Sequence, residues 1–357
     1  MTAISRRMFG LAAAGLTIAL AVRAEARSEP QAIDEGLFVP INGQPQWVTV
    51  RGQDRRNPVL LWLHGGPGIA MSGQAPLFAD WEKDFTIVQW DQPGGGATYA
   101  RNGPDGVGEL SIARYVRDAI AVAEWSCRHL GCRKLVVMGT SWGTLLGLEV
   151  ASRRPDLVSA YVGAAQVVDG NRGARIGWEA ALASARQRGD QAAIAELEKN
   201  GPGPYQTFED FITHQKYVNP PGQKPSPEEA AAIAAAGKLL AGPAPADATY
   251  VARDLPKVDA VKAFLGTQRA MFKPTAEWRA EALGLHFKVP MFFFQGSDDL
   301  NTPTVLVREY VERIHAPVKK LEIVANAGHL VVVFHDRLLT LLDQDVRPLA
   351  LRWAPAA

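Results

Sequence analysis

The sequence predicts an α/β protein with a mostly parallel, doubly wound sheet and an α-helical cap inserted between its strands. Short apolar runs typical of buried strands alternate with longer helical segments in both the first and the last third of the chain. Between them, an Ala-rich stretch with helical patterning is broken by Pro/Gly clusters, which predicts the cap. A linker without regular structure is the alternative for residues 220–227.

These patterns divide the 357 residues into four expected segments. Residues 1–26 are expected to be a signal peptide. Residues 27–166 and 287–357 are expected to form the two parts of one core, and residues 167–286 the cap between them. The roughly 330 residues after the leader are enough for a large core plus an inserted subdomain.

The N-terminal segment has the features of a twin-arginine leader. Ser5-Arg6-Arg7 precedes an uncharged run over residues 8–22, and Ala24-Glu25-Ala26 matches a small-residue cleavage site. The run is shorter than the roughly 20 residues that a spanning helix needs. We therefore expect export through the twin-arginine machinery to the periplasm or beyond, with no stable membrane anchor after cleavage. An uncleaved anchor is the alternative.

Individual elements follow from local signals. Asn42-Gly43 between two β-type runs predicts a hairpin, in which Gln44-Pro45-Gln46 is expected to lengthen the turn. Ser111 and Gly131 are the expected N-cap and stop of a long helix. The triplet Gly94-Gly95-Gly96 is not expected to open a helix, and it lacks the spacing of a nucleotide fingerprint. The other predicted strands are residues 58–63, 85–90, 135–140, 159–164, 289–296 and 320–324.

A candidate nucleophile lies where one of these strands ends. Residues 135–143 read Leu-Val-Val-Met-Gly-Thr-Ser-Trp-Gly, an apolar run that leads into G-x-S-x-G and then into a helical pattern. This is the sequence of a nucleophile elbow, a sharp strand-to-helix turn that exposes one serine. Ser141 is therefore the predicted nucleophile, and a Cβ at either flanking glycine would crowd the turn.

The partners of a nucleophilic serine follow in the expected chain order. Asp299 comes just after the strand that ends at Gly296, and His329 ends the run Ala325–His329 after a later strand. A serine hydroxyl needs a base, and the base needs an acid to fix its tautomer. The order Ser, Asp, His is that of the α/β-hydrolase fold. Asp298 is the alternative acid. The alternative bases do not follow a strand-end Ala-Gly pair: His64, His286, His315 and His335.

A Gly-rich loop provides a candidate oxyanion hole. The strand at 58–63 leads into His64-Gly-Gly-Pro-Gly68, where glycines let backbone N–H groups approach a ligand. The N–H groups of Gly66 and Trp142 are the expected donors to a tetrahedral oxyanion. His64 is expected to order this loop and is a candidate to contact substrate.

Three motifs together resemble the proline iminopeptidase branch of α/β-hydrolases. They are His64-Gly-Gly-Pro-Gly68, Trp90-Asp-Gln-Pro-Gly-Gly-Gly96 and Gly139-Thr-Ser-Trp-Gly143. The family's G-x-x-D-x-x-x-P pattern is matched by residues 296–303, and that register selects Asp299 over Asp298. The resemblance covers most of the mature chain outside residues 170–285. It implies removal of an N-terminal residue, preferably proline, from short peptides by a serine peptidase without a cofactor.

The chain departs from the family at three places. Pro93 stands where the family has arginine, and Thr98 where it has serine. The family's W-x-x-W-E element, whose glutamate binds the substrate's ammonium group, is missing from the cap; the nearest match is Trp178-Glu179. Glu179 is thus a candidate ammonium ligand, with a solvated surface glutamate as the alternative. An esterase, amidase or lactonase, or a ligand-binding protein without turnover, are the alternative functions.

Composition excludes several other classes of function. The chain has 38 basic and 37 acidic residues, and loss of residues 1–26 would remove three arginines and one glutamate, leaving a net charge of −1. With no basic run, nucleic acid is not an expected partner. No metal-ligand spacing or cofactor motif is present, so we expect neither a metal nor a cofactor. The two cysteines, Cys127 and Cys132, lie close enough in sequence to form a disulfide, with reduced thiols as the equal alternative.

Overall fold

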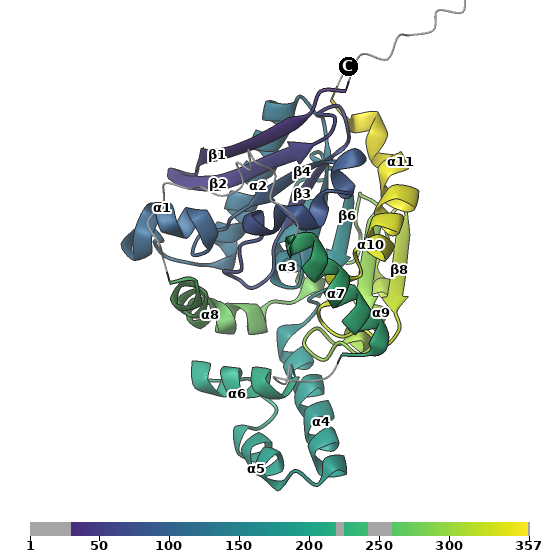
Figure 1. Cartoon of the computed structure of the whole chain (residues 1–357). Helices are drawn as coiled ribbons and strands as arrows, with labels where there is room; N and C mark the ends of the chain where they lie inside the picture. Colours follow the sequence, from purple (N-terminus) through teal and green to yellow (C-terminus); the bar gives the residue numbers. More distant parts are fainter. Residues whose placement is uncertain (1–29, 219–224, 242–258, 356–357) are drawn as a thin grey trace, which may run out of the picture.

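The computed structural model describes residues 30–218, 225–241 and 259–355, and the expected leader at 1–26 lies outside these residues. One sheet of eight strands runs through the described part, in the order β1-β2-β4-β3-β5-β6-β7-β8 (Figure 1). β1, β2 and β4 pair antiparallel, and all other neighbours pair parallel. The strands are β1 (Ile33–Ile41), β2 (Gln44–Gly52), β3 (Val59–Leu63), β4 (Thr86–Trp90), β5 (Leu135–Thr140), β6 (Val158–Ala164), β7 (Met291–Gly296) and β8 (Lys319–Val324).

Helices cover both faces of the sheet, so its central strands are buried on both sides. Along β3, Leu61 and Leu63 join one apolar cluster, whereas Leu60 and Trp62 join the other. The first cluster packs against α2 (Ile112–Leu130), α3 (Trp142–Arg153) and α9 (Thr304–Arg313). The second packs against α10 (His335–Leu341) and α11 (Arg347–Ala350), with the short helical turns at 72–83. The predicted mostly parallel, doubly wound α/β-hydrolase sheet is confirmed.

Two local expectations are wrong. The hairpin turn is not lengthened: Asn42 and Gly43 both have positive φ (46° and 85°) and form a two-residue turn, so Gln44 already pairs with Ile41 in β2. A helix does begin at the glycine triplet, since α1 (Gly96–Gly106) follows Gly95 directly. Glycine's low helix propensity concealed this start, which a buried carboxylate fixes.

The predicted long helix is α2. The Ser111 side chain accepts a hydrogen bond from the Arg114 N–H at 3.2 Å, and Gly131 ends the helix with φ 75°. Just past this end, the Sγ atoms of Cys127 and Cys132 lie 3.2 Å apart as free thiols, and both residues are buried.

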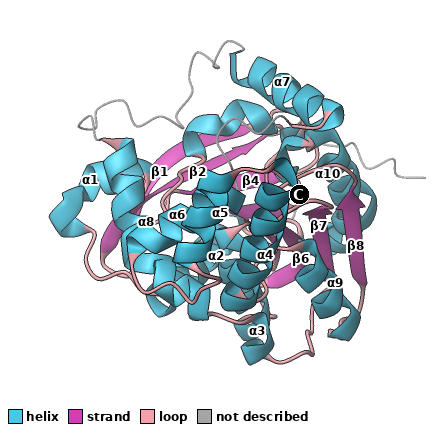
Figure 2. Ribbon diagram, turned by 90° about the horizontal axis from the view of Figure 1, so that it is seen from below, coloured by secondary structure: helices cyan, strands magenta, loops and turns pink. Residues whose placement is uncertain are grey.

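Between β6 and β7 the chain leaves the sheet and forms helices. Figure 1 shows α4, α5 and α6 extending beyond one end of the sheet, while α7 and α8 lie against the core. Viewed from below, α4, α5 and α6 lie across that end of the sheet (Figure 2). Trp178 joins α4 to α5, because its indole N–H donates to the Leu197 carbonyl at 2.8 Å. The helices are α4 (Gly170–Arg188), α5 (Gln191–Asn200), α6 (Phe208–Val218), α7 (Pro227–Ala241) and α8 (Ala260–Glu277). Within the described ranges, no helix is both long and apolar enough to cross a membrane.

Candidate active site

The turn between β5 and α3 holds Ser141 in a strained conformation. Its backbone lies at φ 50° and ψ −120°, a region that residues with a side chain rarely adopt. A Cβ on Gly139 would lie 2.4 Å from the Gly143 carbonyl oxygen, and a Cβ on Gly143 would lie 1.9 Å from the Leu63 carbonyl oxygen. Backbone packing therefore requires both flanking glycines. The turn places Ser141 just beyond the carboxyl end of β5, where its side chain lines the pocket.

The structure brings Ser141, His329 and Asp299 together. They follow β5, β8 and β7, whose carboxyl ends meet at one edge of the parallel sheet. His329 Nε2 lies 3.0 Å from Ser141 Oγ, and His329 Nδ1 lies 3.1 and 3.0 Å from the two oxygens of Asp299. The alternative acid, Asp298, is exposed and accepts a hydrogen bond from its neighbour Ser297.

Asp299 is held by more donors than the sequence pattern indicates. Its Oδ1 accepts the backbone N–H groups of Asn301 and Thr302 at 2.9 and 2.8 Å. Its Oδ2 accepts the Thr302 hydroxyl at 2.6 Å and the Gln295 side-chain amide at 3.0 Å. Gln295 is fully buried at the end of β7, and a polar residue in an otherwise apolar strand was the signal that the sequence offered. Together these groups fix the carboxylate behind the imidazole.

The electrostatics of this group follow from burial and charge. Burial raises the pKa of Asp299, but the His329 charge and the hydrogen bonds from His329 and Thr302 outweigh it, so the pKa is lowered. Burial lowers the pKa of His329, but the Asp299 carboxylate outweighs that effect and the pKa is raised above 6.5. The pair therefore stabilises an imidazolium next to the serine.

The loop after β3 is ordered by His64. Its imidazole is buried, Nδ1 lies 2.8 Å from the Gly65 carbonyl oxygen, and Nε2 accepts the Gln92 N–H at 3.2 Å. Burial lowers the pKa of His64 to about 4, so the ring is neutral. Both ring nitrogens are used inside the loop, and His64 does not line the pocket. Its position thus agrees with ordering of the loop and leaves no ring nitrogen for substrate.

Two backbone donors border the pocket. Gly66 and Trp142 both line it beside Ser141. Trp142 is the first residue of α3, so its N–H has no carbonyl acceptor within the helix. At Gly66, φ is 117° and a Cβ would lie 2.7 Å from the Gly68 nitrogen, so only glycine fits. The structure brings these two expected oxyanion donors to the same wall.

Asp91 orders the loop that contains Gly94, Gly95 and Gly96. Its Oδ2 accepts the Ser72 hydroxyl at 2.9 Å and the Ala97 N–H at 2.8 Å. A Cβ on Gly96 would lie 2.2 Å from that oxygen, so glycine lets the start of α1 approach the carboxylate. Burial raises the pKa of Asp91 to about 6. The residue orders the loop and does not line the pocket.

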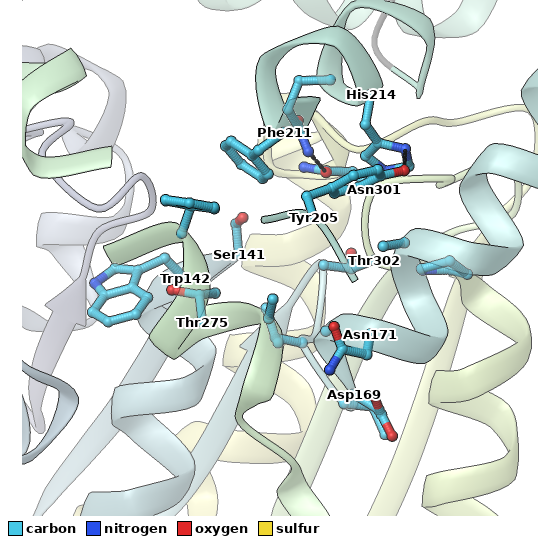
Figure 3. Close-up of a pocket in the computed structure, with 18 of the residues that line it drawn as sticks. Ser141, Trp142, Asp169, Asn171, Tyr205, Phe211, His214, Thr275, Asn301 and Thr302 are labelled. Atoms are coloured by element: carbon cyan, nitrogen blue, oxygen red, sulfur yellow. Dashed lines mark hydrogen bonds between the residues drawn. The ribbon is translucent and has the colours of Figure 1, made fainter. Parts of the chain in front are cut away.

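A pocket of about 220 Å³ lies between this edge of the sheet and the cap. Figure 3 shows Ser141 and Trp142 on one side, with Tyr205, Phe211 and His214 of the cap across from them. Tyr205 and His214 bind each other, with the hydroxyl 2.9 Å from His214 Nδ1, and burial lowers the pKa of His214 to about 4. The cap thus closes the pocket with aromatic and neutral groups.

The described lining residues include one carboxylate, Asp169, and no lysine or arginine. Asp169 is already engaged: it caps α4 by accepting the Arg172 N–H at 2.9 Å and lies 3.6 Å from Arg279. The expected cap carboxylate, Glu179, is exposed and does not line the pocket. Gly177 is buried on the inner side of α4, and two residues further on a helix side chain points to nearly the opposite side.

Comparison with known proteins gives sequence matches that cover part of the chain. Residues 58–201 match the model of the family described as the alpha/beta hydrolase fold. The chain is 38% identical over 130 residues to "Probable aminopeptidase YbaC" of Bacillus subtilis (strain 168), covering 36% of this chain and 40% of the relative. It is 30% identical over 135 residues to "Probable proline iminopeptidase" of Streptomyces coelicolor, covering 38% and 40%. The alignments thus span about two fifths of each relative's length.

The fold is shared over a longer stretch. The proline iminopeptidase-related protein of Thermus thermophilus superposes with a TM-score of 0.60 at 18% identity, covering 90% of this chain and 99% of that one. The superposition shows that this chain has the α/β-hydrolase fold, and residues 58–201 carry the sequence match to the family of that name. The sequence similarity also extends to proteins named as a probable aminopeptidase and a probable proline iminopeptidase.

Proposed function

We propose that this chain is a serine hydrolase that works through an acyl-enzyme, with Ser141, His329 and Asp299 as its catalytic triad. The observation that carries the proposal is the 3.0 Å separation of Ser141 Oγ and His329 Nε2, with Asp299 bound to the other ring nitrogen. Hydrogen-bond reach between nucleophile and base, and between base and acid, is the geometry that this chemistry requires.

In the proposed mechanism Ser141 attacks the substrate carbonyl while His329 takes the hydroxyl proton. The raised pKa of His329 favours this transfer, and Asp299 stabilises the imidazolium. The N–H groups of Gly66 and Trp142 bind the developing oxyanion. His329 then returns the proton to the leaving group, the acyl-enzyme forms, and water releases the acid by the same steps.

Replacement of Ser141 by alanine tests this proposal. We expect Ser141→Ala to lose nearly all hydrolysis of any active acyl substrate and to lose labelling by a fluorophosphonate probe. Retained turnover would reject the assignment. A ligand-binding protein of the same fold is the competing hypothesis, and it predicts poor labelling of the wild-type serine by the same probe.

For the substrate, we propose release of N-terminal residues, proline among them, from short peptides. The named relatives and the glycine motifs support this choice. An esterase, amidase or lactonase acting on small acyl compounds is the second candidate, and a specific observation favours it: the one carboxylate among the described lining residues, Asp169, is already engaged. A substrate ammonium that bound Asp169 would share it with the N-terminus of α4 and with Arg279.

Three substrates separate these candidates: proline β-naphthylamide, its N-acetylated form and p-nitrophenyl butyrate. An aminopeptidase should strongly prefer the free amine. Equal rates on the first two, or activity on the ester alone, would reject the peptidase proposal and leave the general hydrolase in place.

We also propose that the protein works in the periplasm or outside the cell after twin-arginine export. The support is Ser5-Arg6-Arg7, the uncharged run and the Ala24-Glu-Ala26 site. Changing Arg6 and Arg7 together to lysine should retain the precursor in the cytoplasm. Unchanged export of this double variant would exclude that route.

A further inference from the structure

Asn171 stands out among the polar residues of the pocket wall. Its Oδ1 is buried and has no hydrogen-bond partner among the described residues, although the residue lines the pocket. A buried acceptor without a hydrogen-bond partner is costly, so it needs an explanation, and a bound group that donates to it is one. Two other pocket amides have paired oxygens: Gln166 Oε1 accepts the Tyr161 hydroxyl at 2.6 Å, and Asn301 Oδ1 accepts the Gln215 side-chain amide at 3.2 Å.

The position of Asn171 is fixed by close packing at the start of α4. A Cβ on Gly170 would lie 2.6 Å from the Ala276 Cα, so the first turn of α4 rests directly on the end of α8. An isolated bridge between Asp169 and Arg279 continues this contact. The backbone of Asn171 is thus held, whereas its terminal χ2 torsion has a broad energy well and turns at little cost.

Figure 3 shows Asn171 on the pocket wall with its carboxamide directed away from α4 and toward the cavity. Ser141 and Thr302 lie above it in that view. Ser141 and Asn171 line the same cavity, so a group bound through its carbonyl at Ser141 shares the cavity with the Asn171 side chain, and a turn of the carboxamide about χ2 presents its oxygen there. A carboxamide oxygen accepts hydrogen bonds from N–H groups and carries no charge.

We propose that Asn171 is a specificity-determining residue, whose Oδ1 accepts a hydrogen bond from an N–H group on the acyl part of the substrate. This deepens the proposed hydrolase function and rests on it. The donor is either the free amine of an N-terminal residue or the neutral N–H of an acylamino group, since both present the same chemistry to a carboxamide oxygen. Asp169 lies on the same wall, but its Oδ1 caps α4, whereas Asn171 Oδ1 has no partner among the described residues.

Four p-nitrophenyl esters with one leaving group test the inference: glycyl, N-acetylglycyl, N-acetylsarcosyl and butyryl. The sarcosyl ester differs from the N-acetylglycyl ester by replacement of its N–H with N–CH₃. For Asn171→Ala we expect kcat/KM to fall roughly three- to tenfold on the N-acetylglycyl ester, as for loss of one neutral hydrogen bond, and roughly tenfold or more on the glycyl ester, whose donor is a charged ammonium. The sarcosyl and butyryl esters should change less than about twofold, since they cannot make that bond.

Two further variants sharpen the comparison. Asn171→Asp puts a charged acceptor at the same place and should raise the preference for the glycyl over the N-acetylglycyl ester by roughly tenfold. Thr275→Ala is the matched control, because Thr275 lines the same pocket but its hydroxyl is already bonded to the Met271 carbonyl at 2.7 Å. It should not discriminate among the four esters.

The outcomes distinguish the role of Asn171 from the proposed hydrolase activity of Ser141. A selective loss on the glycyl ester alone, on the N-acetylglycyl ester alone, or on both supports the inference and identifies the donor. An equal effect of Asn171→Ala on all four esters, or no effect, overturns it while leaving a Ser141-dependent hydrolase intact. If the wild type hydrolyses none of the esters and resists the fluorophosphonate probe, the proposed function fails and the inference fails with it.

Discussion

Asp299→Asn is the perturbation that most directly tests how the site is built. The carboxylate accepts two backbone N–H groups on Oδ1, and the Thr302 hydroxyl and Gln295 amide on Oδ2. An asparagine can keep its oxygen on the backbone donors only by turning its NH₂ toward Gln295 and His329. That NH₂ then lies next to the NH₂ of Gln295, and since both groups are donors, no hydrogen bond forms between them. It instead donates a hydrogen bond to His329 Nδ1.

The consequence for catalysis is a change of tautomer. When His329 Nδ1 accepts a hydrogen bond, the ring proton moves to Nε2, which lies 3.0 Å from Ser141 Oγ. The ring can then no longer take the serine proton. Loss of the correct tautomer in a serine triad costs about 10⁴-fold in kcat, equivalent to about 5.5 kcal/mol of transition-state stabilisation. We expect a loss of that size in Asp299→Asn with little change in KM.

The assay is steady-state hydrolysis of whichever ester or amide the wild type turns over, together with the rate of fluorophosphonate labelling. Asp298→Asn is the matched control, because this neighbouring acid is exposed and bonds to Ser297. It should keep wild-type activity within about threefold, as for a surface change. Near-wild-type turnover in Asp299→Asn, or an equal loss in Asp298→Asn, would refute the assignment of the acid. A far-UV spectrum and a melting curve establish that both variants are folded.

Three other outcomes follow from the geometry. The kcat/KM should fall as pH drops through the raised pKa of His329, above 6.5, because the imidazolium cannot accept the serine proton; a pH profile with no such acidic limb would contradict this. Gly143→Ala should lower Tm by at least about 5 °C or prevent folding, because its Cβ would lie 1.9 Å from the Leu63 carbonyl oxygen; an unchanged melting curve would be inconsistent with this turn. Oxidised glutathione should join Cys127 and Cys132, whose sulfurs lie 3.2 Å apart, by accepting two electrons and releasing two glutathione thiols; two titratable thiols remaining in denaturant would exclude the bridge.

Local sequence was sufficient for the elements near the site. The requirement for glycine at Gly139 arises from contacts of the turn with itself, whereas that at Gly143 arises from the Leu63 carbonyl at the end of the neighbouring strand β3. Both positions were predicted because they belong to the G-x-S-x-G motif. Both ends of α2 were also predicted correctly, because Ser111 and Gly131 act on their own helix. The start of α1 was missed because the buried carboxylate of Asp91, six residues before Ala97, fixes it against the low helix propensity of glycine.

The sequence by itself determined the fold class, the chain order of Ser141, Asp299 and His329, and the glycine loops, because strand runs, turn glycines and motifs are short local patterns. Only the tertiary structure decided what surrounds them. Asn171 lines the pocket beside Ser141 because α4 packs on α8. Glu179 is excluded from the pocket by the rotation of its helix, which is set by packing across the cap. Such contacts join residues far apart in the chain, and no local pattern records them.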